Sequence, residues 1–369
     1  MTTEIFVLAT LVEVLLIGGI FLLYPRFARR GLLFGVYVGE QVWAGDEAGR
    51  ITRGWYTGMV VWIALTVLVS AVLWSALPSV ALAPLAPILL VVGFLALYLR
   101  AYFQARALAP EGPAPPAATV LTSASSANPI LPFTSVGFGV ACGVAALAYA
   151  ASHYADLPPM VPTHFGLSGA PDAWRPKSFS TVMLLPLMTL VIGVSLGVIA
   201  FLTSRAKRAL RYPLTEVSVA AQTRFREAMT RYISAVGMMA TLMLTLMAIS
   251  SIRVALGLER GLSPVAMIIA GVLLVAALAG TIYIGLRYGQ GGARLERAAS
   301  RAPLTNGLAD NRYWVLGMFY VNRDDPAILV EHRFGLGYTI NLGNWRAVAL
   351  FVLFIGLLLG ITVAALISN

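Results

Sequence analysis

Eight long apolar runs, almost free of charged residues, constrain this chain more than any other feature of its sequence. They cover residues 5–24, 57–77, 83–99, 131–152, 178–203, 232–252, 262–286 and 347–367. Runs of about twenty apolar residues match the hydrocarbon thickness of a bilayer. Peptide groups in lipid must be hydrogen-bonded within the protein, which selects helices over open sheets. The sequence therefore predicts an all-α transmembrane bundle of about eight helices, with the lipid bilayer as its partner.

The positions of lysine and arginine predict how this bundle is oriented. With the N-terminus outside, 22 of the 26 basic residues fall in the inside segments, which are residues 25–56, 100–131, 203–231 and 287–346. The outside segments hold only Arg175, Lys177, Arg253 and Arg260. Basic residues concentrate in the cytoplasmic loops of membrane proteins. The split therefore predicts a multi-pass protein with both termini outside, an N-out/C-out topology.

Composition excludes several classes of protein. The net charge is +10, but the arginines lie in short loops beside apolar runs and not along one basic and aromatic face, so we predict no nucleic-acid partner. Charged residues make up 11% of the chain, against about a quarter in soluble domains. The single cysteine, Cys142, lies in an apolar run and excludes disulfides and multi-cysteine metal sites.

Shifts in composition divide the chain into five predicted parts. An N-terminal three-helix unit covers residues 1–103, and an Ala/Pro/Ser-rich flexible linker covers residues 104–130. A two-helix unit with an outside loop follows over residues 131–203. Residues 204–286 form a basic inside segment and two further helices, and residues 287–369 form a Tyr- and Trp-rich inside segment and the last helix.

The predicted outside loop, residues 157–177, contains five prolines together with glycine and serine. This composition predicts ordered, non-helical structure. A proline-rich lead is followed by a histidine–aromatic pair, Gly-x-Pro-Asp, an aromatic residue and a lysine. This order, within residues 131–203, resembles a bacterial membrane domain of unknown function shared with the Sdp toxin-immunity proteins. The residues that carry the resemblance are Pro162, His164, Phe165, Gly169, Pro171, Asp172, Trp174 and Lys177.

The resemblance implies a protein of the bacterial plasma membrane with an immunity-type role. Residues that would contact a peptide, a toxin or another ligand outside the membrane are His164, Phe165, Asp172, Trp174 and Lys177. His164 titrates near neutral pH and can donate a proton or bind a metal. The alternative is a rigid hairpin whose His, Asp and Lys side chains bond to one another and to the turn backbone. We predict no metal site and no cofactor, because the histidine and aspartate spacing matches no metal motif.

The predicted inside segment before the last run is rich in aromatic residues and asparagine. Residues 319–321, 328–331 and 338–341 have the composition of short strands, and residues 322–326 that of a turn. The pattern resembles a second uncharacterised domain, found at the C-terminal end of related bacterial membrane proteins. It is carried by Tyr313, Trp314, Gly317, Tyr320, Asn322, Asp325, Pro326, Arg333, Gly335, Gly337, Thr339 and Asn341. We expect a small cytoplasmic β-rich cap that docks a protein partner through Trp314, Tyr320, Asn322, Asp325 and Arg333.

Glu13 is the only Asp, Glu, Lys or Arg within the eight runs. A charged side chain at mid-depth costs roughly 2.5–3.5 kcal/mol on insertion scales, so we expect Glu13 to face protein or water. It would then form a structural hydrogen bond between helices or serve as an intramembrane acid in transport. Both interpretations remain open from the sequence.

Three GxxxG spacings lie inside the runs, at Gly139/Gly143, Gly193/Gly197 and Gly356/Gly360. Such spacings let two helices approach closely. Packing within the bundle is the favoured interpretation, and a homodimer seam is the alternative.

A sequence motif typical of enzymes occurs in the chain, but the structure expected around it does not suit catalysis. Gly193-Val-Ser-Leu-Gly197 lies in an apolar helix, whereas a nucleophile elbow needs a strand-to-helix turn. We therefore predict a non-enzymatic sensor or immunity-type protein without a catalytic residue. The alternative is a transporter, or a transporter accessory, that uses Glu13.

Overall fold

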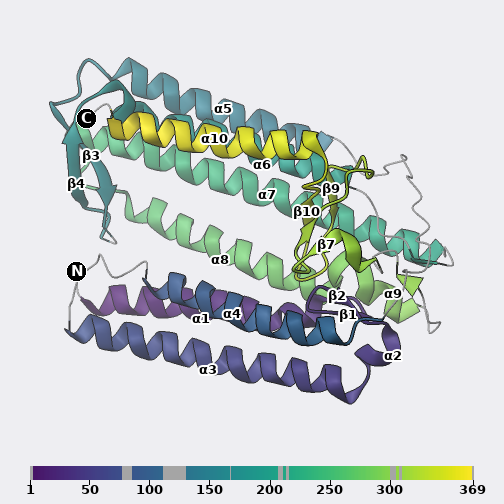
Figure 1. Ribbon diagram of the computed structural model, residues 1–369. Coiled ribbons are helices and arrows are strands. Elements are labelled where there is room, and N and C mark those ends of the chain that lie inside the picture. Colours follow the sequence, from purple (N-terminus) through teal and green to yellow (C-terminus); the bar gives the residue numbers. More distant parts are fainter. Residues whose placement is uncertain are drawn as a thin grey trace. The chain divides into compact units, whose positions relative to one another are not determined.

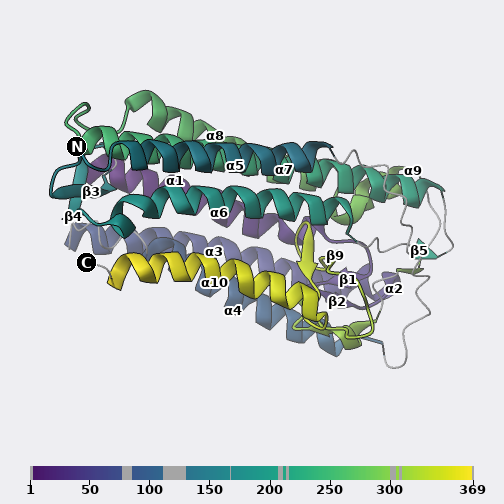
Figure 2. The same ribbon diagram turned by 90° about the horizontal axis from the view of Figure 1, so that it is seen from above.

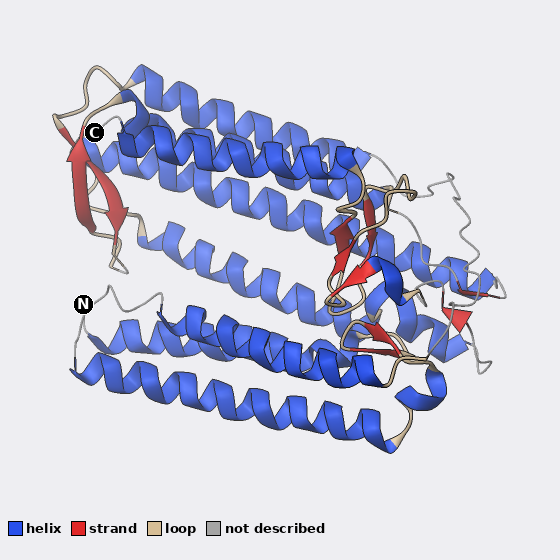
Figure 3. Cartoon of the chain, in the orientation of Figure 1, coloured by secondary structure: helices blue, strands red, loops and turns tan. Residues whose placement is uncertain are grey.

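The computed structural model describes residues 3–76, 85–110, 130–166, 168–206, 211–212, 216–299, 305–306 and 310–367 of the chain (Figure 1). Most of them are helical (Figure 3). The α-helices are α1 (Thr3–Phe27), α2 (Glu40–Trp43), α3 (Asp46–Ala76), α4 (Leu85–Ala107), α5 (Ile130–Ser152), α6 (Phe179–Ser204), α7 (Glu216–Ala255), α8 (Pro264–Arg287), α9 (Ala293–Ala299) and α10 (Trp345–Ile367).

In the described part of the chain, short strands and two 3₁₀ turns connect the helices. The strands there form five two-stranded antiparallel pairs, β1–β2, β3–β4, β5–β6, β7–β8 and β9–β10. Their bounds are β1 (Leu32–Leu33), β2 (Val36–Tyr37), β3 (Met160–Phe165), β4 (Pro171–Pro176), β5 (Arg211–Tyr212), β6 (Thr305–Asn306), β7 (Trp314–Val315), β8 (Phe319–Tyr320), β9 (Leu329–Glu331) and β10 (Tyr338–Ile340). The 3₁₀ turns are η2 (Gln290–Gly292) and η3 (Asn311–Tyr313).

Eight helices of the described residues are long and apolar enough to cross a membrane: α1, α3, α4, α5, α6, α7, α8 and α10. Each covers all or nearly all of one apolar run, so the prediction of eight helices able to span a membrane is confirmed. The protein is a multi-pass membrane protein built from helices. Predicted strands 319–321, 328–331 and 338–341 are also confirmed, as β8, β9 and β10.

Several helices extend beyond their apolar runs. α3 begins at Asp46 and α7 at Glu216, well before residues 57 and 232, where the apolar runs begin. Asp46 and Glu47 in the first turn of α3 interact favourably with the helix dipole. α4 continues to Ala107, so residues 104–107 of the predicted linker are helical, because Ala, Gln and Arg are strong helix formers. Linker residues 111–129 lie outside the described part of the chain.

The chain divides into two compact units that interleave in sequence. Unit 1 comprises the described residues within Met1–Ser123, Ala206–Phe225 and Thr281–Asn344. Unit 2 comprises those within Ala124–Arg205, Arg226–Gly280 and Trp345–Asn369. This differs from the five consecutive parts predicted from composition, because side chains after α8 pack with the N-terminal helices.

Unit 1 has an aromatic core between α1, α3 and α4, which contact one another. Trp55 and Tyr98 are almost fully buried, on α3 and α4. Phe334, which follows β9, enters this core. Its ring centroid lies 4.6 Å from that of Tyr98, with the planes tilted, and 5.5 Å from that of Tyr24, edge to face. One residue of the C-terminal segment therefore packs against all three N-terminal helices.

Unit 2 is built around the close pair α5 and α6, which run side by side in both views (Figures 1 and 2). A Cβ atom on Gly139 would lie 2.7 Å from the backbone carbon of Gly193, and one on Gly197 would lie 2.5 Å from Val136. Two of the three predicted GxxxG spacings thus form one packing seam within the unit. The third differs, because Gly356 and Gly360 on α10 have open space at the Cβ position.

This seam predicts a difference between two glycine-to-leucine variants. Gly193→Leu should lower the free energy of unfolding by about 1–3 kcal/mol or more, since its side chain has no room between α5 and α6. Gly356→Leu is the matched control and should leave stability unchanged. Chemical denaturation in detergent micelles measures both, and equal stabilities of the two variants would contradict the packing role.

Candidate functional site

The predicted outside loop forms the hairpin β3–β4 in unit 2. Its register pairs Met160 with Pro176 and Phe165 with Pro171, with irregularities on either side of His164. The turn is closed by one backbone hydrogen bond, in which the Gly166 N–H donates to the carbonyl oxygen of Ala170, 2.9 Å. Prolines leave strand edges without N–H donors, which accounts for a short and irregular ladder.

The polar side chains of this hairpin bond as the rigid-hairpin interpretation requires. His164 Nδ1 lies 2.5 Å from Asp172 Oδ1, and both side chains are largely exposed. Lys177 Nζ donates to the carbonyl oxygens of Ala155 (3.2 Å) and Leu157 (3.0 Å) and lies 4.9 Å from the Tyr154 ring centroid. Lys177 therefore fastens the end of the hairpin to the end of α5.

The hairpin is also fastened to the helices below it. Ser251 on α7 donates a hydrogen bond to the carbonyl oxygen of Pro162, 3.2 Å. The N–H of Leu262, just before α8, donates to the carbonyl oxygen of Gly169, 2.8 Å. Trp174, another predicted contact residue, is exposed on β4. One face of the hairpin is therefore exposed, while hydrogen bonds to α7 and to the start of α8 hold the hairpin in position.

Beneath the hairpin lies a cavity of about 380 Å³. Its walls come from β3, α6, α7 and α10, and most of its lining is apolar; it includes Val161, His164, Phe165, Met247, Ala255 and Thr362. The cavity thus brings two of the predicted contact residues, His164 and Phe165, to the same opening. Binding pockets are typically concave, mostly apolar and edged by a few polar groups, and this cavity has that character.

A second cluster of polar and charged side chains lies in unit 1, and the sequence did not predict it. Arg29 Nη2 forms a buried ion pair with Glu331, 2.8 Å, at exposed fractions of 0% and 3%. Arg29 also donates to the carbonyl oxygens of Gln290 (3.3 Å) and Gly291 (2.9 Å). Gly291 has φ +58°, and a Cβ there would overlap both charged side chains. We call Arg29, Gln290, Gly291 and Glu331 the Arg29 cluster.

Gln290 extends this cluster to the loop after β9. Its Nε2 donates to the carbonyl oxygens of His332 (2.9 Å) and Gly337 (2.8 Å), and its Oε1 accepts from the Gly337 N–H, 2.8 Å. The His332 ring accepts a hydrogen bond from the Phe334 N–H, 3.1 Å. Burial lowers the pKa of His332 to about 4, so its imidazole is neutral at pH 7 and acts here as an acceptor.

Arg333, one of the predicted cap residues, is fully buried. Its guanidinium donates to Asn311 Oδ1 (2.7 Å) and to the carbonyl oxygen of Asp310 (2.9 Å), and it lies 4.8 Å from the Trp314 ring centroid. Burial lowers the pKa of Arg333 to about 9, which still leaves it charged at pH 7. The Arg333 guanidinium also donates a hydrogen bond to the carbonyl oxygen of Gly35, between β1 and β2, 3.3 Å.

The other predicted cap residues meet at Asn341. Its amide donates to the carbonyl oxygens of Asn322 (2.8 Å) and Asp325 (2.9 Å) and accepts from the Asn322 N–H, 3.0 Å. The Tyr320 hydroxyl donates to Asp325 Oδ2, 2.9 Å, and burial raises the pKa of Tyr320. The structure therefore brings Tyr320, Asn322 and Asp325 together, but they mainly hold the turn between β8 and β9.

Glu13 differs from its expected surroundings. Its side chain lies on the exposed face of α1, next to exposed Val12 and opposite buried Val14. It lines neither the cavity beneath the hairpin nor the one between α3 and α4, and among the described residues it makes no hydrogen bond or ion pair. The expected interhelical hydrogen bond is therefore not formed within that part of the chain, and the transport role of Glu13 stays a prediction.

Potential metal ligands do not gather in the described ranges, where no group of three or more His, Cys, Asp or Glu side chains could hold an ion. The His153 ring, just after α5, lies tilted against the Tyr149 ring, with the two ring centroids 4.3 Å apart. Its Nδ1 also lies 2.9 Å from the Tyr149 carbonyl oxygen. His153 therefore has a local role at the end of α5.

Comparison with known proteins finds two partial family matches. Residues 142–190 match a domain of unknown function, DUF1648, which here covers the second half of α5, the β3–β4 hairpin and the first half of α6. Residues 323–348 match a family of unknown function, DUF5808, which here covers β9, β10 and the start of α10. Both matches fall on segments that resembled uncharacterised domains. No curated protein and no solved structure matches the chain.

Sequence reasoning missed the Arg29 cluster. Arg29 counted only as one of the basic residues that set orientation, and Glu331 lay within a predicted strand. Gln290 and Gly291 lie in the glycine-rich segment Gly289-Gln-Gly-Gly292, whose composition does not indicate a buried charge pair. A buried arginine at the end of an apolar run requires an acceptor, but the sequence does not say which acidic residue supplies it.

The cluster predicts a large loss of stability when one charge is removed. Glu331→Gln should lower the free energy of unfolding by about 3–5 kcal/mol, because Arg29 would remain buried without a counter-charge. Combining it with Arg29→Met should recover part of this loss. Glu47→Gln, which removes an exposed ion pair with Arg50, is the control and should behave like the wild type. Equal free energies of unfolding for Glu331→Gln and Glu47→Gln, measured by denaturation in detergent, would contradict this prediction.

Proposed function

We propose that this protein is a non-enzymatic sensor or immunity-type protein of the bacterial plasma membrane. Its β3–β4 hairpin and the cavity beneath it bind an apolar segment of a peptide or toxin outside the membrane. The cavity of about 380 Å³ that opens beside His164 and Phe165 is the observation that carries this proposal. The resemblance of the same loop to the toxin-immunity proteins supports it.

The chemistry of the site favours binding over catalysis. Its lining is mostly apolar, so it would gain affinity by burying an apolar ligand surface. His164 and Asp172 already bond to each other, and they offer a polar rim that can pair with the backbone of an extended peptide. Ser251 and Lys177 hold the hairpin in position, so little ordering would be required when a ligand enters.

The proposal includes an orientation, with the hairpin outside and the β7–β10 segment inside. The distribution of basic residues supports it, because 22 of 26 lie on the side assigned to the cytoplasm. We propose that the inside segment docks a cytoplasmic partner through its exposed residues, such as Phe319 and Val321. Arg333 and Asp325 would hold that surface in place and not contact the partner, since both are buried.

A survival assay tests the binding role. Cells sensitive to a membrane-active peptide toxin should survive better when they express the wild-type protein. His164→Ala, at the rim, and Ala255→Phe, which fills the cavity from α7, should remove this gain. His153→Ala is the matched control, because His153 lies outside the cavity, and it should protect like the wild type. Equal survival of cells with and without the protein would remove the immunity proposal.

Cysteine labelling tests the orientation separately. In a Cys142→Ser background, an impermeant maleimide applied to intact cells should label Ser168→Cys at the hairpin turn. Arg323→Cys should be labelled only after the membrane is opened, although both positions are exposed in the structure. Labelling of Arg323→Cys in intact cells would reverse the proposed topology.

A further inference from the structure

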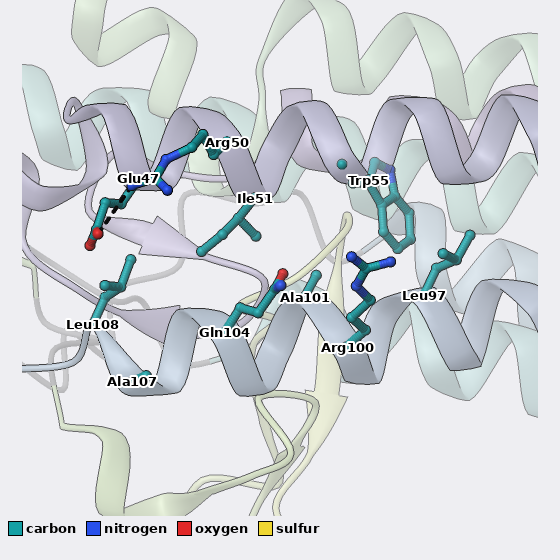
Figure 4. Close-up of a pocket in the computed structure, with 11 residues that line it drawn as sticks. Glu47, Arg50, Ile51, Trp55, Leu97, Arg100, Ala101, Gln104, Ala107 and Leu108 are labelled. Atoms are coloured by element: carbon teal, nitrogen blue, oxygen red, sulfur yellow. Dashed lines mark hydrogen bonds and ion pairs between the residues drawn. The ribbon is translucent and has the colours of Figure 1, made fainter.

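A separate cavity of about 360 Å³ lies in unit 1, between the N-terminal part of α3 and the C-terminal part of α4 (Figure 4). Its lining differs from that of the hairpin cavity because it is partly cationic. The residues that define it are Arg50, Gly54, Trp55, Leu97, Arg100 and Gln104. None of them belongs to the hairpin site or to the Arg29 cluster.

The cavity lies where both helices change from polar to apolar. The apolar run of α3 begins at residue 57 and that of α4 ends at residue 99, so Trp55 and Arg100 stand at this boundary. One turn further into the apolar region, Val60, Val61 and Leu95 are exposed. A molecule in the cavity would therefore have its polar end at the depth of lipid headgroups and apolar helix surface next to it.

Arg100 supplies a cation that no acidic side chain of the described residues neutralises. Its guanidinium extends from α4 across the groove toward Trp55 (Figure 4), and it forms no ion pair within the described residues. The one acidic residue of the lining, Glu47, is engaged with Arg50, 3.2 Å. The groove thus offers Arg100 and the Gln104 amide to an anion.

Two further features make this groove suitable for a ligand. A Cβ on Gly54 would meet no atom within 4 Å, so the α3 wall is open at that point. Trp55, 2% exposed, forms a rigid wall beside this opening.

We propose that this groove binds the phosphate of an anionic phospholipid, with the acyl chains lying along the exposed apolar faces of α3 and α4. Arginine is well suited to phosphate because its planar guanidinium can donate two parallel hydrogen bonds. Basic pockets between transmembrane helices are a recurrent form of headgroup site. The proposal holds for either orientation of the protein and does not depend on the hairpin function.

Native mass spectrometry of the full-length protein in detergent tests this directly, with phosphatidylcholine, phosphatidylglycerol or cardiolipin added. The wild type should bind the two anionic lipids more tightly than phosphatidylcholine. Arg100→Gln should weaken anionic binding about fivefold, as expected for one arginine near a lipid surface. Gly54→Leu, which fills the groove and keeps every charge, should weaken it as well.

Arg53→Gln is the matched control, because it removes one exposed arginine from the same end of α3 without altering the lining. It should bind lipid like the wild type. Circular dichroism of each variant shows whether the helices remain intact. Equal anionic-lipid affinity of the Arg100, Gly54 and Arg53 variants would overturn the proposal. If Arg100 were needed to bind inorganic phosphate but the protein showed no preference for anionic lipid, the ligand would be free phosphate and the lipid proposal would be wrong.

Discussion

Backbone groups that lie outside regular helices and strands need other partners, and this requirement explains much of the structure. Water cannot satisfy them in lipid or in a buried segment. Here side chains do so: Arg29 reaches the carbonyl oxygens of η2, and Gln290 those of the loop after β9. Arg333 reaches Gly35, and Asn341 holds the turn before β9. The irregular segments are thus held by donors that come from distant parts of the chain.

The same requirement explains why charged residues are buried in unit 1. A buried ion pair such as Arg29–Glu331 adds little net stability compared with apolar residues of the same size. Its geometry is specific, however, and it links the end of α1 to a strand 302 residues later. Phe334 lies three residues beyond Glu331 and packs between α1, α3 and α4. The ion pair and the ring together define where the C-terminal segment lies on the N-terminal helices.

Unit 2 uses a different means of holding its parts together. Small residues let α5 and α6 approach closely, and the β3–β4 hairpin is fastened by Lys177, Ser251 and Leu262. The apolar cavity below the hairpin remains open within this rigid frame. An apolar cavity whose edge is held in position by hydrogen bonds is typical of a preformed binding site. The turn around Asn341 differs, because its polar groups bond to one another.

Much of the fold could be predicted from sequence, because its signals are local. Span length, the excess of basic residues, GxxxG spacing and the proline-rich composition each act over a few turns of chain. They correctly predicted eight spanning helices, the short strands and the segments that match families of unknown function. His164 and Phe165, which carry part of the family resemblance, line one cavity in the structure, and their role in binding stays a prediction.

Long-range contacts were decided only by tertiary structure. The partner of Arg29, the insertion of Phe334 and the groove between α3 and α4 depend on which helices pack together, and no local pattern records this. Glu13 illustrates the same limit, since its position in an apolar run is evident from sequence but the direction of its side chain is not. The sequence by itself determined which segments cross the membrane, because burial in lipid depends on composition. The tertiary structure determined which polar groups meet, because pairing depends on geometry.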